Sequence, residues 1–271
     1  MSAAPINTSN TFYSEAEWDE QAWIDVIRVE YDTLIAGFDF NGLHSGKTPG
    51  NLRLLDLGCG TGIFARFLDP LLDEGIQFDT DLLDISEQSL TTCRANLKEL
   101  EHFSTSEEFL FPIEAIANDE VPLNTSYDVI WALHSFTTVE VSKMKNVLRV
   151  LRRLLSDTGY LLIYQLNAQS SYQILHKYYL DSTGAAGRAY MEAEKTSQIL
   201  TEIGWEFEAR PFEFVHRIPA DDRDALENYL QKVVLDHDVD AINSFEALLP
   251  EFLKEGKYEF PQKVSLLVLR K

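Results

Sequence analysis

The stretch LLDLGCGTG, from Leu54 to Gly62, places three glycines closely behind an aspartate and an apolar run. Glycine has no Cβ, so its backbone can adopt positive φ and approach a ligand closely. A glycine turn between a strand and a helix commonly brings a nucleotide to the N-terminus of that helix. The dinucleotide fingerprint G-x-G-x-x-G fails, because Ile63 occupies the position of its third glycine. The observed D-x-G-x-G-x-G spacing therefore disfavours an NAD-dependent dehydrogenase and leaves another nucleotide-like ligand.

Three further sites could act together with this turn. Asp84 ends the run FDTDLLD, where a carboxylate can accept both hydroxyls of a ribose or, alternatively, cap the next helix. The segment FPIEAIA offers Glu114 and Ile116 near the expected position of an adenine. His134 follows the run YDVIWAL and could be a general base, a hydrogen-bonding group for a substrate, or a structural histidine at a strand end.

Hydrophobic periodicity indicates the elements that must position these groups. Strands are expected at 52–57, 78–84, 107–113, 127–133 and 160–166, within WEFEARPFEFVHR, and at 263–271. Helices are expected at 62–72, 87–101, 140–155, 192–203, 221–236 and 244–254, after an N-terminal helical segment that begins near Ser14. Ser86 is expected to cap the helix at 87–101. Gly159 is expected to follow the end of the helix at 140–155, before the strand at 160–166 begins. The alternation predicts a parallel sheet with helices on both faces and ligands at the carboxyl ends of the strands.

The composition argues against several classes of protein. The 271 residues, 45% of them hydrophobic, suffice for one α/β domain with a sizeable core. A net charge of −21 argues against a nucleic-acid partner. No run approaches the roughly 18 apolar residues of a membrane span, no signal peptide is visible, and two cysteines are too few for a disulfide framework. So few cysteines favour a reducing, cytoplasmic setting. His237 has no second histidine or cysteine at ligand spacing, so we expect that the protein uses no metal.

The motifs LLDLGCGTG, LLDISEQSL and SYDVIWALHSF, in this order, resemble those of the class I S-adenosylmethionine-dependent methyltransferases. The resemblance covers about residues 50–166, and the terminal strand corresponds to the family's seventh. It implies an α/β, Rossmann-like fold with a seven-stranded mixed sheet, mostly parallel with the last strand antiparallel, and helices on both faces. It also implies S-adenosylmethionine as cofactor and S-adenosylhomocysteine as product. The cofactor-binding positions that this reading predicts are Asp56, Gly58, Cys59, Gly60, Gly62, Asp84, Ile85, Ser89, Glu114, Ile116 and Leu133.

A narrower resemblance, to histamine N-methyltransferase, rests on YDVIWALHSFTTVEV, QSSYQILHKYYL and EGKYEFPQKVSLLVLRK. The long excursion before the last strand is also similar. The resemblance implies that an aromatic residue of the N-terminal segment, Tyr13, closes over the cofactor. It further implies that a carboxylate of the N-terminal helix meets the substrate. Asp19 and Glu20 both suit that role, and Glu20 is taken as the predicted residue.

The same resemblance implies the rest of the substrate pocket. Gln262, which enters the last strand, looks like a substrate-binding amide of that family, while His134 stands where the family has another amide. Tyr172 and His176 stand where the family has two tryptophans. The expected pocket is therefore aromatic, but it differs in shape and polarity from a pocket for histamine.

These features predict one domain, residues 1–271, with an N-terminal helical cover at 12–40 and a cofactor-binding core at 50–166. The substrate-side part at 167–271 contains a helical insertion, at about 219–256, that acts as a lid. The predicted activity is S-adenosylmethionine-dependent methyl transfer to a nitrogen of a small amine or imidazole-type molecule by a monomeric enzyme, with His134 as its catalytic residue. Two alternatives stay open. One is O-methylation of a small natural product, in which His134 would deprotonate a hydroxyl, and the other is a non-catalytic regulatory protein that binds the cofactor.

Overall fold

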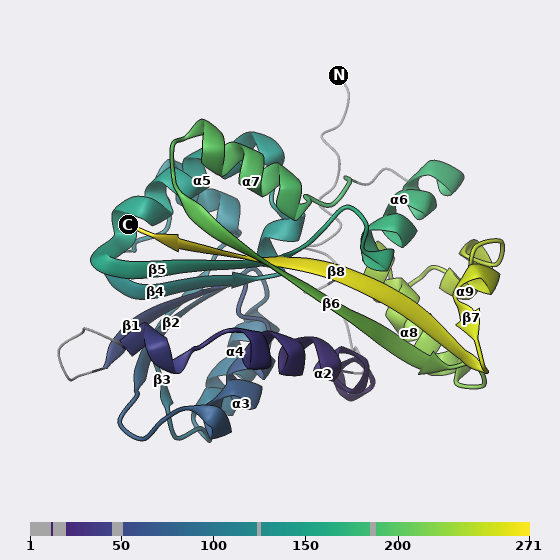
Figure 1. Ribbon diagram of the computed structural model, residues 1–271, viewed down its shortest axis with the longest axis horizontal. Helices are drawn as coiled ribbons and strands as arrows, with labels where there is room; N and C mark the ends of the chain where they lie inside the picture. Colours follow the sequence, from purple (N-terminus) through teal and green to yellow (C-terminus); the bar gives the residue numbers. More distant parts are fainter. Residues whose placement is uncertain (1–11, 13–19, 45–50, 124–125, 185–187) are drawn as a thin grey trace.

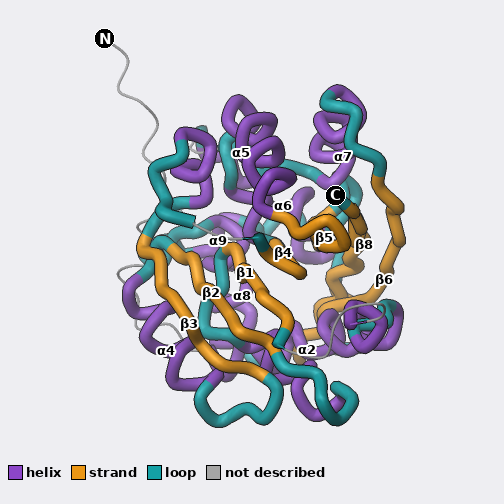
Figure 2. Tube along the Cα trace, turned by 90° about the vertical axis from the view of Figure 1, so that its left-hand side faces the viewer, coloured by secondary structure: helices purple, strands orange, loops and turns teal. Residues whose placement is uncertain are grey.

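The computed structural model describes residues 12, 20–44, 51–123, 126–184 and 188–271. Its strands are β1 (Leu52–Leu57), β2 (Phe78–Asp84), β3 (Phe103–Leu110), β4 (Tyr127–Leu133), β5 (Leu155–Leu166), β6 (Phe207–Pro219), β7 (Leu253–Lys254) and β8 (Lys257–Arg270). They form one sheet in the order β3-β2-β1-β4-β5-β8-β6, with the short β7 paired to β8 (Figures 1 and 2). Strands β1 to β5 are parallel, and β8 runs antiparallel to both β5 and β6. The predicted fold class, a mostly parallel seven-stranded sheet with an antiparallel last strand, is confirmed.

Helices cover both faces of this sheet. They are α2 (Glu20–Gly37), α3 (Ile63–Leu68), α4 (Glu87–Leu97), α5 (Val141–Leu154), α6 (Ser171–Thr183), α7 (Ala193–Glu202), α8 (Arg223–Val234) and α9 (Ala241–Ser244). Side chains alternate between the faces of a strand, so Leu54 packs into the core beneath α2, α3 and α4, and Leu55 into the core beneath α5 and α7 (Figure 1). Burial on both faces explains why β1, β2 and β4 have the bounds predicted from their apolar runs.

A third core lies beyond the sheet, at one end of the long β6–β8 hairpin. There α6, α8 and α9 gather around the ends of β6 and β8 (Figure 1). Trp23 and Val26 of α2 pack against the same cluster. The chain between β6 and β8 therefore forms a packed cap that also contacts the N-terminal helix.

Several predicted elements have different bounds. Strand β5 begins directly after α5, so Gly159 lies inside the strand and does not end a helix. A Cβ at Gly159 would stand 2.8 Å from the carbonyl oxygen of Tyr127, which explains the glycine by the close approach of β4. Strand β3 begins and ends earlier than predicted. It ends at Leu110 because Pro112 cannot donate a backbone hydrogen bond to a neighbouring strand and the next residues, Ile113–Asn118, form a 3-10 helix.

The predicted helix at 244–254 is wrong. The chain instead forms the short α9, a 3-10 turn at Leu249–Glu251 and β7. Pro250 explains the break, since it lacks the backbone N–H that a continuing helix requires. The last strand, in turn, begins earlier than predicted, at Lys257.

Side chains cap two helix N-termini, and the first of these caps, Ser86, is the one predicted from the sequence. Ser86 Oγ accepts a hydrogen bond from the Ser89 amide at 3.1 Å at the start of α4. Asp222 accepts one from the Ala225 amide at 3.0 Å at the start of α8, within the acidic run that precedes that helix. Within the described ranges, no helix combines the length and apolar character needed to span a bilayer.

Candidate active site

A cavity of about 840 Å³ opens at the carboxyl ends of the central parallel strands. Its walls come from the glycine turn after β1, from residues that end or follow β2, β3 and β4, and from α2, α6 and α8. This is the edge of the sheet at which the sequence predicts ligand binding. The cavity has two ends, one built around the glycine turn and the other around α2.

The glycine turn approaches the cavity with its backbone. Gly58 has φ 71°, and a Cβ there would stand 2.4 Å from the Cβ of Ser135, so this position excludes a side chain. Gly60 has φ 52° and borders the cavity, and a Cβ there would meet nothing within 4 Å. Cys59 also lines the cavity. The turn therefore leaves an open cradle for a ligand, of the kind that the D-x-G-x-G-x-G spacing predicts.

Asp84, at the end of β2, holds this cradle in place. One carboxylate oxygen accepts a hydrogen bond from the Gly60 amide at 2.9 Å and the other accepts one from the Ser86 amide at 2.9 Å. Burial raises the pKa of Asp84 above its ordinary value, although these amides and the charge of Lys232 oppose the rise. Each oxygen of a carboxylate has two acceptor sites, so Asp84 retains capacity for the hydroxyls of a ribose.

Two of the predicted cofactor residues lie behind the cradle. Asp56 is not among the residues that line the cavity, and burial raises its pKa to about 7, with the neighbouring charge of Asp84 adding to the rise. Gly62 is also off the cavity wall, and a Cβ there would stand 2.9 Å from Cys93 Sγ, so this glycine lets the turn pack against α4.

The segment after β3 forms the adjoining wall. Glu114 lines the cavity together with Phe111 and Ile113, and Glu114 also accepts a hydrogen bond from the Glu140 amide at 3.1 Å. Ile116, predicted beside the adenine, is instead buried in the core and is absent from the cavity wall. The wall on this side is completed by Ile85, Ser89 and Leu133, all three of them predicted cofactor residues.

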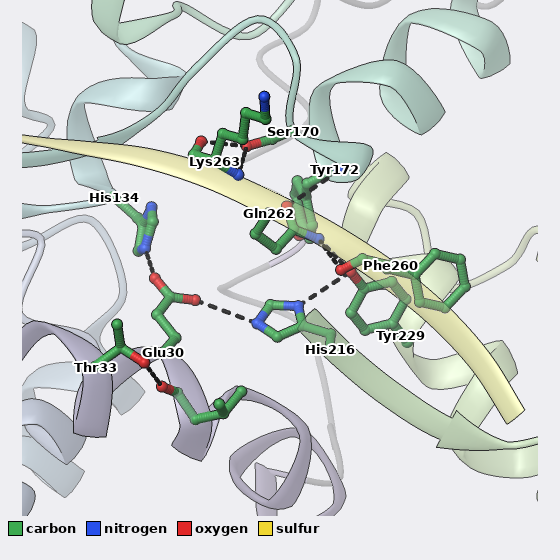
Figure 3. A network of polar contacts seen from close by, with 11 residues as sticks. Glu30, Thr33, His134, Ser170, Tyr172, His216, Tyr229, Phe260, Gln262 and Lys263 are labelled. Atoms are coloured by element: carbon green, nitrogen blue, oxygen red, sulfur yellow. Dashed lines mark hydrogen bonds and ion pairs between the residues drawn. The ribbon is translucent and has the colours of Figure 1, made fainter. Parts of the chain in front are cut away.

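At the other end of the cavity, the α2 residue Glu30 lies between two histidines (Figure 3). Glu30 Oε1 contacts Nε2 of His134, and Glu30 Oε2 lies 3.5 Å from Nε2 of His216 on β6. All three side chains border the cavity. Burial alone would raise the pKa of Glu30, but the charge and hydrogen bonds of His134 and His216 outweigh it and lower the pKa to about 2. Glu30 therefore remains ionised.

His134 has an unusual backbone and an unused ring atom. Its φ of 60° lies in the left-handed region, which a non-glycine residue adopts rarely and often near functional sites. Its amide donates to the carbonyl oxygen of Tyr164 at 2.7 Å, which anchors this conformation to β5. Its Nδ1 is buried and has no hydrogen-bond partner among the described residues.

An aromatic wall joins α2, α6 and the chain before α7. Tyr172 and Tyr190 stack with ring centroids 6.0 Å apart, and Trp23 meets Tyr172 edge-on at 6.4 Å. Lys232 Nζ lies 5.1 Å from the ring centroid of Phe12 and 5.7 Å from that of Trp23. All five side chains line the cavity, which gives this end an aromatic and partly cationic surface.

Two predicted substrate residues stand behind this wall. His176 stacks on Tyr190 at 3.6 Å, its ring nitrogens contact the carbonyl oxygens of Val233 and Arg188, and burial lowers its pKa. Gln262 is almost fully buried and bonds to other protein groups. Neither residue is among those that line the cavity.

Tyr13 lies outside the described residues, as do Asp19 and the side chain of Glu20. The carboxylate that the described part of α2 brings to the cavity is Glu30, which sequence reasoning missed, as it missed His216, Tyr190 and Lys232. Glu30 gave one usable signal. It is an acidic residue on the face of the N-terminal helix that also carries Trp23 and Ile27, both of which border the cavity.

The comparisons with known proteins agree with this geometry. Residues 55–161 match a family model described as a methyltransferase domain. No curated protein matches the chain. Solved structures with the same fold include the N-methyltransferase NodS from Bradyrhizobium japonicum in complex with S-adenosylhomocysteine, with a TM-score of 0.53, 14% identity, and 98% of each chain covered.

Two further structures illustrate the breadth of that fold. Mycolic acid cyclopropane synthase CmaA1 gives a TM-score of 0.54 at 14% identity, over 96% of this chain and 93% of that one. The plantazolicin methyltransferase BamL gives a TM-score of 0.51 at 16% identity, over 97% of this chain and 95% of that one. At such identities these likenesses show the fold. Residues 55–161 therefore form a methyltransferase domain, and the fold and the glycine cradle agree with S-adenosylmethionine as its cofactor.

Proposed function

We propose that the enzyme methylates a nitrogen atom of a small amine or imidazole-type molecule. The observation that carries this proposal is the ionised carboxylate of Glu30, which is 5% exposed and borders the cavity. His134 and His216 pair this buried charge, and because little water screens it, the carboxylate also attracts a cationic ligand in the cavity. A protonated amine or an imidazolium is such a ligand.

The end of the cavity around the glycine turn has the space and the hydrogen-bonding groups that S-adenosylmethionine requires. Gly58, Cys59 and Gly60 would surround the methionyl part, where the open face of Gly60 leaves room for it. Asp84 would accept the ribose hydroxyls through its remaining lone pairs. The bound cofactor supplies a methyl group activated by a positively charged sulfur.

The adenine would lie along the wall after β3. Ile85, Ser89, Glu114 and Leu133 are the predicted cofactor residues that border this region of the cavity. Asp56, Gly62 and Ile116 would support the cradle from behind, and Tyr13 is proposed to close over it.

We assign His134 the removal of a proton from the substrate. Carboxylate oxygens only accept hydrogen bonds, so the His134 nitrogen that contacts Glu30 carries a hydrogen. In neutral His134 the lone pair is then on Nδ1, the atom without a partner. An alkylammonium must lose a proton before its nitrogen can attack, and that lone pair can take it. Glu30 would stabilise the imidazolium that forms.

The same lone pair could also deprotonate a hydroxyl, which is the O-methylation alternative. Electrostatics favours nitrogen, because removing a proton from an ammonium leaves a neutral amine, whereas removing one from a phenol leaves an anion near the Glu30 carboxylate. Tyr172 and Trp23 would flank a flat or cationic substrate on the other side.

We further propose that the enzyme is a cytoplasmic monomer, that residues 12–40 act as a cover, and that the insertion at about 219–256 closes the substrate end. Both cysteines are free, which suits a reducing compartment. The α2 residues Trp23, Ile27 and Glu30 border the cavity, so movement of this helix would open it. Hydrogen exchange with and without S-adenosylhomocysteine tests the cover, since residues 20–31 should gain protection on binding.

The substrate class is tested by a panel of small amines, imidazoles and phenols incubated with isotope-labelled S-adenosylmethionine. Mass spectrometry should find label on amines or imidazoles, and Glu30→Gln should reduce that labelling by about tenfold or more, since it removes the charge that attracts the substrate. Labelling of phenols alone would replace the proposal by its O-methylation alternative.

A further inference from the structure

The site contains a chain of polar contacts that continues well behind the cavity. From Glu30 it runs to His216 on β6, then to Tyr229 on α8, and ends at Gln262 on β8 (Figure 3). Tyr229 and Gln262 are each 1% exposed, and neither borders the cavity. Two buried polar side chains that cannot touch a ligand therefore connect to a carboxylate that can.

The direction of the two hydrogen bonds between Gln262 and His216 can be deduced from Gln262. Its Oε1 must accept from the Tyr172 backbone amide, at 3.4 Å, because that amide can only donate. Its Nε2 must donate to the carbonyl oxygen of Phe260, at 3.3 Å, because a carbonyl can only accept. The amide of Gln262 is thereby fixed from both sides. Its Nε2 consequently also donates to Tyr229 Oη at 3.1 Å.

This orientation determines what the Tyr229 hydroxyl does. With Gln262 donating to its oxygen, the Tyr229 hydrogen is available for Nδ1 of His216 at 3.2 Å. Burial raises the pKa of Tyr229 well above its ordinary value, so the hydroxyl keeps its hydrogen. His216 then accepts at Nδ1 and carries its own hydrogen on Nε2, the atom that lies 3.5 Å from Glu30 Oε2. The opposite tautomer would turn a lone pair of Nε2 toward the carboxylate.

From these contacts we propose that His216, Tyr229 and Gln262 are positioning residues for the reaction, because they fix the hydrogen on His216 Nε2 and thereby hold Glu30 against His134. Glu30 in turn keeps the lone pair of neutral His134 on Nδ1. We call this chain of contacts, from Glu30 through His216 and Tyr229 to Gln262, the relay. Gln262 is thus reassigned from a substrate contact to the far end of the relay. The inference rests on the proposed function for its kinetic consequence, but the tautomer of His216 does not depend on any substrate.

The relay connects the N-terminal helix and the helical insertion to the sheet. Its members come from α2, the N-terminal helix, from α8 of the insertion, and from the strands β6 and β8. Besides Lys232, which lines the cavity, the insertion thus contributes Tyr229, which acts on the Glu30 end of the cavity from behind its wall. Packing of α2 and α8 on the third core, where Tyr229 meets Trp23 at 5.8 Å, would set the geometry of Glu30.

The tautomer is measured directly by nitrogen NMR on the full chain labelled with ¹⁵N-histidine. The chain has six histidines, and the His216 signals can be assigned by their loss in His216→Gln. Wild type should show the His216 hydrogen on Nε2 and an unprotonated Nδ1. Tyr229→Phe should raise the share of the tautomer with its hydrogen on Nδ1 above that in wild type, because the donor to Nδ1 is gone and only Glu30 still favours a hydrogen on Nε2. Gln262→Glu should move the hydrogen to Nδ1, since Tyr229 then donates to the new carboxylate and accepts from His216.

Kinetics provides the second readout. Tyr229→Phe should lower kcat by about tenfold or more while leaving the KM for S-adenosylmethionine unchanged, since a misplaced base loses part of the usual 10²–10⁴-fold contribution of acid–base catalysis. Gln262→Glu should lower kcat further. Tyr178→Phe is the matched control, because Tyr178 packs in the same core and its hydroxyl bonds to no described residue. It should behave as wild type.

The outcomes separate the relay from the proposed function. A wild-type His216 with its hydrogen on Nδ1 overturns the relay, and so does a Tyr229→Phe variant with wild-type kcat. Suppose that no amine or imidazole is methylated but wild type, Tyr229→Phe and Gln262→Glu show the expected tautomers of His216. The substrate assignment then fails and the relay stands.

Discussion

The two ends of the cavity are built in different ways. The end where we propose that the cofactor binds uses the backbone of the glycine turn, with Gly58 and Gly60 in left-handed conformations and Asp84 bonded to the Gly60 amide. The end where we propose that the substrate binds uses side chains from distant segments, since Glu30 and His134 are 104 positions apart and His216 comes from the far edge of the sheet. A cofactor shared by a whole fold suits a local motif, whereas a substrate is selected by side chains that the tertiary structure assembles.

The difference is also electrostatic. Asp56 is half-buried and Glu30 is buried, yet the pKa of Asp56 is raised to about 7 and that of Glu30 is lowered to about 2. Burial raises both values. Asp56 has another carboxylate, Asp84, as a neighbour, while Glu30 has two imidazole groups. The neighbours therefore decide which end of the cavity holds a permanent negative charge.

The largest expected effect comes from removing the base at the substrate end. His134→Ala should lower kcat/KM for the methyl acceptor by about 100-fold or more, the usual scale for a general base. Calorimetry should find the affinity for S-adenosylhomocysteine unchanged, because His134 makes no contact with the cradle in its role as base. A parallel loss of cofactor affinity would show that the two ends are not separable.

A change at the cofactor end should have the reverse signature. Asp84→Ala should weaken S-adenosylhomocysteine binding by roughly 1.5–3 kcal/mol, the scale of hydrogen bonds to a charged group. It should also loosen the Gly60 turn, whose amide Asp84 accepts. Glu87→Ala, an exposed acidic residue on α4, is the control and should bind as wild type. Tight binding by Asp84→Ala would place the ribose elsewhere.

These two ends were not equally predictable from the sequence. The bounds of β1, β2 and β4, the glycine turn and the Asp84 position follow from local patterns, because buried parallel strands and glycine turns leave continuous signals. Glu30 leaves only its position on the helix face that carries Trp23 and Ile27, and His216 leaves no signal, since each is a single polar residue whose partner is distant along the chain. Gln262 was predicted from resemblance as a substrate contact, and only the packed structure shows that its amide bonds within the protein.

The ionised Glu30 also makes a prediction for stability. Its folded pKa of about 2 lies below its ordinary value of 4.5, so its contribution is fully present above pH 4.5 and is lost as the pH falls toward 2. Glu30→Gln should therefore lower the free energy of unfolding by about 2 kcal/mol at neutral pH, given 1.4 kcal/mol per pKa unit with some relaxation. Denaturant titrations should show this gap shrinking at acid pH. Glu213→Gln, an exposed control on β6, should show no gap.

Asp56 should show a smaller effect of opposite sign. Its folded pKa of about 7 lies above its ordinary value of 3.8, so the protonated form favours folding and that advantage is lost as the pH rises toward 7. Asp56→Asn should consequently gain about 1 kcal/mol of stability above pH 7, a figure that allows for partial solvent exposure, and nothing below pH 4. An equal gain at every pH would contradict the assigned pKa.

A substrate that offers both an amine and a phenol shows whether the enzyme methylates nitrogen or oxygen. Tyramine is such a molecule, and it can be incubated with the enzyme and S-adenosylmethionine labelled in its methyl group. Fragment mass spectrometry then locates the label within the product. We expect label on the amine nitrogen, most of it lost in Glu30→Gln. Label on the phenol oxygen, unaffected by Glu30→Gln, would show that the enzyme is an O-methyltransferase whose substrate does not depend on Glu30.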